Sequence, residues 1–241
     1  MHINILTIFK DMVQTVLGTS ILARATANGT LSFEVIDIRD FSLDKHKKTD
    51  DYPFGGGAGL TMTAQPIFDA FAYVEQKYGK TLRVYMSPQG KVLDVSTTKR
   101  LSTHSAITLL CGHYEGVDQR VLDVCIDEEM SIGNYILTGG ELPALVLCDA
   151  VARFVPGVIE QSAHEDESLY EGFLEAPQYT RPAVFRELPV PEVLLGGHHA
   201  KIAQWKRQQA VITTAKKRPE LLQQATLTPE EQKIVQSIIE P

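Results

Sequence analysis

Apolar residues follow two different spacings along the first 155 residues of the chain. Continuous or alternating apolar runs, which are typical of β-strands, occupy residues 3–9, 31–38, 82–88 and 106–112. Helical spacing predicts helices over residues 11–27, 64–78, 94–102 and 141–153. The stretch from 119 to 133 predicts a short helix followed by a strand. Strands that alternate with helices in this way predict an α/β fold with a parallel sheet.

The pattern changes after about residue 155. Residues 158–173 are acidic, rich in turn formers and poor in periodic apolar positions, which predicts a flexible linker. From residue 190 onward the spacing is helical, and the segment TPEEQKIVQSII begins with an N-cap threonine, a proline at the first helical position and two acidic residues. We therefore expect one domain over 1–157, this linker, and a small all-helical domain over 174–241.

The balance of charge differs between the two parts. The formal net charge of the chain is -7, which by itself argues against a nucleic-acid partner, because such proteins usually present a basic surface. Residues 174–241, however, carry nine Lys and Arg against seven Asp and Glu, whereas the residues before them carry fourteen against twenty-three. This asymmetry permits a basic contact face on an acidic protein.

The three cysteines, Cys111, Cys125 and Cys148, lack the spacing of a metal site. Their odd number and apolar surroundings predict free, buried thiols in a reducing compartment. The N-terminal segment has no basic region ahead of its short apolar run, and no segment approaches the roughly 18 apolar residues of a membrane span. We expect a cytoplasmic protein with no membrane partner.

Three predicted strand ends carry turns of unusual composition: YMSPQGK (85–91), CGHYEGVD (111–118) and SIGNYILTGGELP (131–143). Ligands of open α/β sheets bind outside the carboxyl ends of the strands. Glycines there let backbone groups approach a flat, neutral base closely. The chain has neither a GxxxxGK[ST] loop nor a GxGxxG turn that opens a helix, which excludes phosphate cradles of those kinds. The alternative is that these glycines merely end strands.

Five segments, DDYPFGGGAGL, SPQGK, CGHYEG, MSIGNYILTGGELPA and APQYTRP, closely resemble those of the bacterial tRNA (guanine-N1)-methyltransferases, over essentially the whole chain. The resemblance implies a SPOUT-type α/β domain whose C-terminal part forms a trefoil knot, a small helical domain that binds tRNA, and a homodimer. The implied reaction transfers a methyl group from S-adenosylmethionine to N1 of the guanosine immediately 3′ of the anticodon (position 37), which supports reading-frame maintenance. Knots are so rare that the apolar pattern alone would not predict one.

The resemblance places the cofactor between the three strand-end segments. The implied cofactor contacts are Tyr85, Ser87, Pro88, Gly112, Tyr114, Glu115, Ile132, Gly133, Asn134, Tyr135, Ile136, Leu137, Gly139, Gly140 and Pro143. The family commonly has Asp at the position of Asn134, so a charge is lost and a hydrogen-bond acceptor is kept. Glu115 matches the family's acidic residue near the methionine end of the cofactor, where Mg²⁺ is used, and is therefore also the candidate metal ligand.

Methyl transfer to guanine N1 needs the donor and acceptor in line, a base for the N1 proton, and a positive group for the charge that develops on O6. By resemblance the positive group is Arg153. The family's base is the aspartate of an Asp-Ser-Phe motif, and the matching residue in EDESLYEGF is Glu167, followed by serine and leucine. The neighbouring Asp166 is the alternative base.

Two segments are candidates for contact with RNA. HKKTDDYPFGGGAGL resembles the family's loop near the target base, although a glycine-rich loop is equally typical of a flexible surface loop; the implied contacts are Asp50, Gly55, Gly56, Gly57 and Gly59. In WKRQQAVITTAKKRPELL, cations beside an aromatic ring suit contact with an RNA backbone and base stacking. The candidates there are Lys206, Arg207 and Arg218.

Two alternative functions stay open at this point. The first is a SPOUT methyltransferase that acts on another RNA, such as ribosomal RNA, against which the APQYTRP segment and the C-terminal helices argue. The second is a nucleotide-binding module without catalysis. That alternative would be favoured if Arg153 and both candidate carboxylates could be replaced without loss of methylation.

Overall fold

The structure is a computed structural model that describes residues 1–160, 169 and 172–239. It divides into two compact units, Met1–Ile159 and Glu160–Pro241, and each is described by itself. In the described part of the chain, no helix combines the length and the apolar character that a bilayer crossing requires. All three cysteines are buried and free, as predicted.

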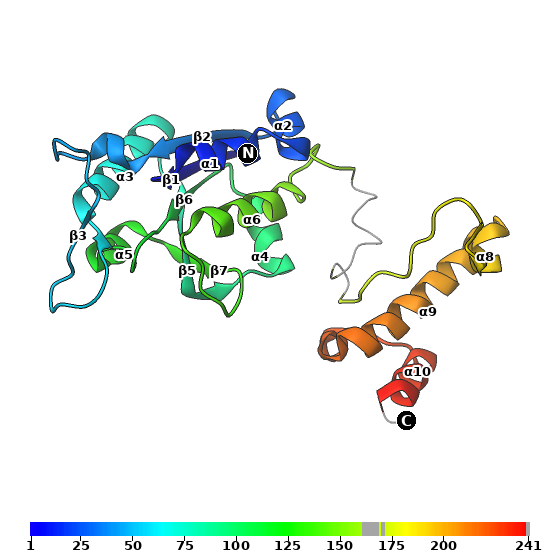
Figure 1. Cartoon of the computed structure of the whole chain (residues 1–241). Helices are drawn as coiled ribbons and strands as arrows, with labels where there is room; N and C mark the ends of the chain where they lie inside the picture. Colours follow the sequence, from blue (N-terminus) through cyan, green and yellow to red (C-terminus); the bar gives the residue numbers. More distant parts are fainter. Residues whose placement is uncertain (161–168, 170–171, 240–241) are drawn as a thin grey trace. The chain divides into compact units, whose positions relative to one another are not determined.

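The first unit is built on a five-stranded sheet with the strand order β2-β1-β6-β5-β7 (Figure 1). Its strands are β1 (His2–Thr7), β2 (Ser32–Asp37), β5 (Leu82–Val92), β6 (Ala106–Cys111) and β7 (Glu128–Ser131). Every neighbouring pair is parallel, which confirms the predicted α/β class. The carboxyl ends of all five strands therefore lie along one edge of the sheet.

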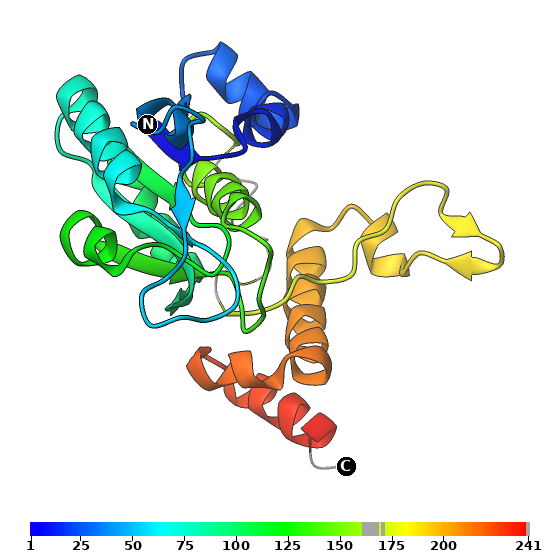
Figure 2. The same cartoon turned by 60° about the vertical axis from the view of Figure 1, so that its left-hand side comes forward.

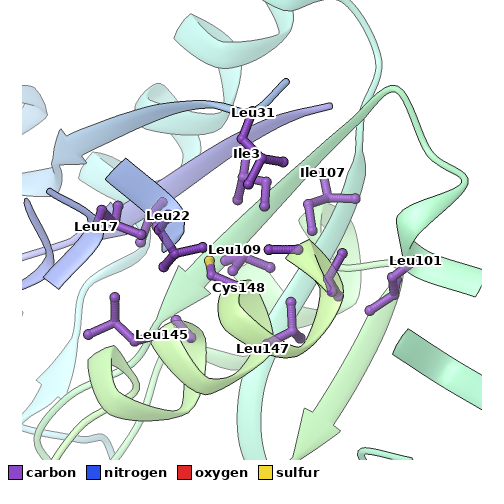
Figure 3. Close-up of a cluster of buried hydrophobic side chains, with 14 of the residues drawn as sticks. Ile3, Leu17, Leu22, Leu31, Leu101, Ile107, Leu109, Leu145, Leu147 and Cys148 are labelled. Carbon is purple, nitrogen blue, oxygen red and sulfur yellow. The ribbon is translucent and has the colours of Figure 1, made fainter. Parts of the chain in front are cut away.

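Two layers of helices cover the sheet. The layer on one face consists of α1 (Lys10–Leu17), α2 (Ser20–Ala27), α4 (Val95–Ser102) and α6 (Glu141–Ala152), and the other consists of α3 (Ala64–Tyr78) and α5 (Gln119–Cys125). Figure 3 shows the core of the first layer, where Leu109 of β6 meets Leu147 and Cys148 of α6. Burial of each such aliphatic side chain contributes about 1.5–3 kcal/mol, so α6 is held firmly against the sheet.

Two predicted elements differ from those observed. The single helix expected over 11–27 is wrong, because the chain turns at Gly18 and Thr19, which is extended with φ of -124° and ψ of 157°, and begins a new helix at Ser20. The strand expected to end at residue 88 instead continues to Val92. A register shift between Met86 and Lys91 absorbs the Pro-Gln-Gly turn, so the strand resumes its pairing with β7.

The second unit contains the helices α8 (Glu192–Leu195), α9 (His199–Lys217) and α10 (Pro229–Ile239), with a 3₁₀ turn, η2 (Pro219–Gln224). Figure 2 shows a small hairpin ahead of them, β8 (Val184–Phe185) with β9 (Leu188–Pro189), which the sequence pattern did not predict. The predicted cap of α10 is confirmed. The Thr228 backbone N–H donates to Glu231 Oε2 at 2.8 Å, and the Glu231 backbone N–H donates to Thr228 Oγ1 at 3.3 Å.

Candidate functional site

The three glycine-rich strand ends of the first unit converge on one cavity of about 300 Å³. Two of them follow β6 and β7, and the third, residues 85–88, lies within β5. These three strands are neighbours at one side of the sheet. The lining residues are Tyr85, Met86, Ser87, Pro88, Gly112, His113, Tyr114, Glu115, Gly116, Met130, Ser131, Ile132, Gly133, Tyr135, Ile136, Leu137, Thr138, Gly139, Gly140 and Pro143. We call this space the strand-end cavity.

Backbone contacts join the three segments around the strand-end cavity. His113 and Gly139 form an antiparallel bridge, and the Gly140 N–H donates to the carbonyl oxygen of Gly112 at 2.8 Å. On the other side, Lys91 and Val92 of β5 pair with the end of β7. The segment around the end of β7 is thereby fixed to β5 and to the segment that follows β6, although these lie far apart in the sequence.

Gly140 is required by this arrangement because two backbones touch there. A Cβ atom at this position would lie 2.8 Å from Cys111 Cα and 2.8 Å from Gly112 N. Such distances are shorter than any ordinary van der Waals contact, so only glycine fits without displacement of the main chain. The residue directly precedes α6, and its close contact therefore sets where that helix begins.

The charge in the strand-end cavity suits a neutral base and a positive group. Among the described residues that line it, Glu115 is the one carboxylate and there is no lysine or arginine. A phosphate would find no cation there, whereas a sulfonium would face a carboxylate. Burial, with a smaller contribution from the Glu129 carboxylate, raises the pKa of Tyr85 to about 12, so its hydroxyl stays protonated.

Part of the cavity wall is apolar and open to solvent. Tyr135 is 55% exposed, Ile136 78% and Leu137 38%. The turn that carries them is held at its base by Ser131, whose hydroxyl donates to the Gly133 carbonyl oxygen at 3.0 Å. Apolar side chains that stand exposed at the mouth of a cavity are typical of a surface that a ligand or partner covers.

A buried carboxylate stabilises the backbone next to the strand-end cavity. Glu141, in the first turn of α6, is 3% exposed. Its Oε1 accepts a hydrogen bond from Thr7 Oγ1 at 2.8 Å, and the same hydroxyl accepts from the Phe9 N–H at 2.9 Å. These bonds tie the end of β1 to the start of α6.

The glycine-rich segment that was predicted to contact RNA lies beside the strand-end cavity. Its ends form a short antiparallel pair, β3 (Asp50–Asp51) with β4 (Thr61–Met62). The Met62 N–H donates to the Gly116 carbonyl oxygen at 2.9 Å, and the Glu115 N–H donates to that of Leu60 at 3.0 Å. Burial raises the pKa of Tyr114, and so does the Asp50 carboxylate, which is hydrogen-bonded to the Tyr114 hydroxyl. The segment is therefore attached to the turn that lines the cavity.

Gly59 lies in close contact with a residue that lines the cavity. Its φ is +91°, and a Cβ atom there would lie 2.5 Å from Cγ and 2.7 Å from Oε1 of Glu115. The Glu115 side chain thus lies directly against Gly59. Gly55, Gly56 and Gly57 also have positive φ angles but no neighbour within 4 Å, and Phe54 beside them is fully exposed.

Fourteen of the fifteen residues predicted to contact a cofactor line the strand-end cavity. The exception is Asn134, which is exposed and does not line it. The prediction missed the other lining residues, which are Met86, His113, Gly116, Met130, Ser131 and Thr138. His113 could have been found from its place in the CGHYEG turn. Its Nδ1 is buried and has no hydrogen-bond partner among the described residues.

The other predicted site residues are more scattered. Arg153 is the C-cap residue of α6 and is partly buried, and it does not line the cavity. Glu167 and Asp166, the two candidate bases, lie outside the described residues. In the second unit Arg207 is paired with Glu231 at 2.7 Å and Arg218 is paired with Glu220, while Lys206 lines a separate cavity.

Comparison with known proteins gives a consistent result. The model of the family described as "tRNA (Guanine-1)-methyltransferase TrmD" matches residues 1–224. A tRNA (guanine-N(1)-)-methyltransferase of Ruminiclostridium cellulolyticum is 52% identical over 223 residues, which cover 92% of this chain and 96% of that protein. One of Alkaliphilus oremlandii is 48% identical over 99% of this chain and 98% of that protein. The crystal structure of tRNA (m1G37) methyltransferase from Aquifex aeolicus matches with a TM-score of 0.77 at 36% identity, over 92% of this chain and 95% of that one.

Proposed function

The chain belongs to the tRNA (guanine-N1)-methyltransferase family, and from this premise we propose that it transfers a methyl group from S-adenosylmethionine to N1 of the guanosine at position 37 of tRNA. The observation that carries the proposal is the convergence of three segments at the strand ends on one cavity, in which Glu115 is the one carboxylate among the described lining residues. It works on tRNA in the cytoplasm, where its free thiols stay reduced.

The strand-end cavity is the proposed site of the cofactor. Backbone groups of the turns after β6 and β7 recognise the adenine, a flat and neutral base. Glu115 faces the positive part of the cofactor, because it is the one carboxylate among the described residues that line the cavity. The exposed turn that carries Tyr135 and Ile136 covers the ligand.

The glycine-rich segment presents the target guanosine to the methyl group. Asp50 and Gly59 anchor it to the turn of residues 114–116, and the exposed Phe54 offers a surface for stacking. Gly55, Gly56 and Gly57 leave its tip free of steric contact. The donor and acceptor are thereby held in line, which supplies much of the rate enhancement.

Two side chains complete the chemistry. Glu167 removes the N1 proton of guanine, with Asp166 as the alternative base, and this assignment rests on the family motif since both residues lie outside the described part of the chain. Arg153 stabilises the negative charge that develops on O6. In the in-line displacement, the N1 lone pair forms the new bond to the methyl carbon while the carbon–sulfur bond breaks, and the proton passes to the carboxylate.

The predicted Mg²⁺ ligand does not by itself form a metal site. Glu115 lies against Gly59, and among the described residues there is no group of three His, Cys, Asp or Glu placed to share an ion. Water supplies several of the six oxygen ligands of Mg²⁺, and one carboxylate does not define such a site. The described residues therefore assign no step of the reaction to Mg²⁺.

The family also suggests a homodimer and a knotted chain. In support of the dimer, α1 and α6 pack together and expose Met12, Val16, Leu142 and Val146, each at least 42% accessible. Val16→Lys is expected to give a monomer in light scattering.

In support of the knot, the segment after β7 is hydrogen-bonded to Gly112 before it enters α6. Pulling the chain from both ends should leave it shorter than an unknotted chain of this length.

The decisive experiment is methylation of tRNA transcripts that carry guanine or adenine at position 37, followed by digestion and mapping of the product. We expect N1-methylguanosine at position 37 of the first transcript and no product with the second. Glu167→Ala is expected to lose most of the rate and to keep cofactor binding. The same loss in Asp166→Ala, with the rate of Glu167→Ala unchanged, would assign the base to Asp166 instead. A methyl group on another base, or on ribosomal RNA alone, would contradict the proposal.

A further inference from the structure

A buried carboxylate that the proposed chemistry does not use lies next to the strand-end cavity. Glu141 and Glu231 are the two charged side chains buried in the described part of the chain, 3% and 9% exposed. Glu231 forms an ion pair with Arg207. Among the described residues, no Lys, Arg or His forms an ion pair with Glu141. Burial of a charge without a partner of opposite sign is strongly destabilising.

The hydrogen bond to Glu141 does not offset its charge. Oε1 accepts from Thr7 Oγ1 at 2.8 Å, and a hydroxyl is a neutral donor. Such a bond satisfies one oxygen of the carboxylate and leaves the net negative charge in place. A residue that lowers stability in this way is typical of a functional site, where a ligand supplies the missing interaction.

Gly139 places the Glu141 carboxylate directly against the wall of the strand-end cavity. A Cβ atom on Gly139 would lie 2.5 Å from Glu141 Oε2 and 2.7 Å from Cδ2 of His113. Gly139 and His113 line the cavity, and Glu141 does not. One layer of backbone therefore separates the carboxylate from the cavity, and the absence of a side chain on Gly139 keeps this layer thin.

The charges around the cavity leave a cation as the natural ligand. No lysine or arginine is found among its described lining residues, and Glu115 is the one carboxylate there. Glu115 is exposed, so water and salt screen its charge, whereas a buried charge is screened much less. The negative charge of Glu141 acts on its surroundings: burial raises the pKa of the neighbouring Cys111 thiol well above its usual range, and Glu141 raises it further.

From these features we propose that Glu141 is the buried counter-charge of the methyl donor, and that it stabilises a sulfonium in the strand-end cavity through the backbone of Gly139. Glu141 is then a positioning residue, because it does not touch the ligand. The proposal rests on the proposed function, since the ligand is taken as S-adenosylmethionine. When the methyl group is transferred, the sulfonium becomes a neutral thioether, so the attraction to Glu141 is lost and release of the product is favoured.

Isothermal titration of the full-length protein with two ligands tests the role of the charge. S-adenosylmethionine and S-adenosylhomocysteine differ by one methyl group and by the positive charge on sulfur. Glu141→Gln keeps the shape of the side chain and the oxygen that accepts from Thr7, and removes the charge. Its Kd should rise roughly 5- to 30-fold for S-adenosylmethionine and change less than about twofold for S-adenosylhomocysteine.

A matched variant separates charge from shape. Glu141→Asp keeps the charge and withdraws it by one methylene group, so it should weaken the binding of both ligands by similar factors and keep the ratio of their Kd values near that of the wild type. Salt gives a further comparison. In about 0.5 M salt the effect of Glu141→Gln should persist, whereas that of Glu115→Gln should shrink, because Glu115 is exposed.

Stability without ligand distinguishes this role from a structural one. Because Glu141→Gln removes an uncompensated buried charge and keeps the Thr7 bond, its urea midpoint should equal or exceed that of the wild type. A carboxylate that mainly holds the fold together would instead give a lower midpoint, or a variant that does not fold, and equal loss of affinity for both ligands. Either of those results overturns the proposal.

The outcomes also separate this proposal from the proposed function. A selective loss of affinity for S-adenosylmethionine in Glu141→Gln supports the counter-charge, whichever base of an RNA receives the methyl group. Normal methylation of tRNA by the wild type, with the ratio of Kd values unchanged in Glu141→Gln, overturns the counter-charge and leaves the function intact. If the wild type binds neither ligand, the proposed function fails and this inference fails with it.

Discussion

Replacement of Gly140 by alanine tests whether the strand-end cavity depends on close contact between two backbones. The φ of Gly140 is -83°, which alanine adopts readily, so the substitution adds no backbone strain. It adds a Cβ atom 2.8 Å from Cys111 Cα and from Gly112 N, where ordinary contact begins at 3.4 Å. These are main-chain atoms that cannot rotate away, so one of the two segments must move by roughly 0.6 Å or more.

The expected magnitude follows from two terms. The movement weakens the bond from the Gly140 N–H to the Gly112 carbonyl oxygen, which contributes about 1 kcal/mol. Overpacking of a close contact costs about 1–3 kcal/mol more. If half of this total falls on the shape of the cavity, the Kd for S-adenosylmethionine should rise about 5- to 30-fold, at roughly 1.4 kcal/mol for each factor of ten.

Isothermal titration with S-adenosylmethionine measures this effect. The matched control is Gly196→Ala, because Gly196 also has a negative φ, of -80°, and its nearest atoms would be 3.8 Å from the new Cβ. Circular dichroism restricts the comparison to folded protein. We expect weaker binding by Gly140→Ala alone. Equal dissociation constants in the wild type and both variants would refute the role given to this contact.

Three further substitutions test other parts of the structure. Gly59→Ala should displace the Glu115 side chain and lower methyl transfer to tRNA about tenfold or more. Gly56→Ala is its control, because Gly56 also has a positive φ, of +78°, but has open space around it, so this variant shows the effect of backbone strain alone. Equal activity of the two variants in a steady-state assay would contradict the role given to the contact between Gly59 and Glu115. Asp94→Ala removes the cap of α4 and should destabilise the protein by about 1 kcal/mol near pH 7. Hydrogen bonds from the Thr97 hydroxyl and N–H lower the Asp94 pKa from 3.8 to about 2. The stabilisation by this cap is therefore present above pH 3.8 and is lost as the pH falls toward 2. If the difference between the urea midpoints of the wild type and Asp94→Ala has not narrowed by about pH 3, these hydrogen bonds are not its cause. Glu231→Ala removes both the ion pair with Arg207 and the cap of α10, and should lower the free energy of unfolding of the second unit by about 1–2 kcal/mol. The control is Glu230→Ala, at an exposed neighbouring position. Equal urea midpoints of the two variants would show that the bonds of Glu231 contribute nothing.

The periodicity of apolar residues predicted the sheet and most of its helices, because buried parallel strands and amphipathic helices leave strong patterns. It could not locate the break at Gly18, where the helical spacing of Val16 and Ile21 continues across a turn of the backbone. It also missed the continuation of β5 to Val92, because the pairing of Lys91 with Met130 is a long-range contact that a Pro-Gln-Gly turn conceals. The β8–β9 hairpin is too short to leave a periodic signal.

The site was predictable to the extent that its residues lie in the distinctive turns. The glycines and their neighbours marked the three strand ends, and these do meet in one cavity. The hydrogen bond that ties β1 to the start of α6 beside the cavity was not predictable, because Thr7 and Glu141 are 134 positions apart and meet only in the folded chain. The roles of Arg207 and Arg218 also depend on partners that the local sequence does not reveal, because both were predicted to contact RNA and both are paired with carboxylates.

The most direct test of the account is a crystal structure of the full chain with S-adenosylhomocysteine, the product of methyl transfer. The account predicts that the adenosine lies between residues 85–88, 112–116 and 131–140, with the sulfur end toward Glu115. A ligand bound elsewhere, with those three segments making no contact to it, would contradict the central claim.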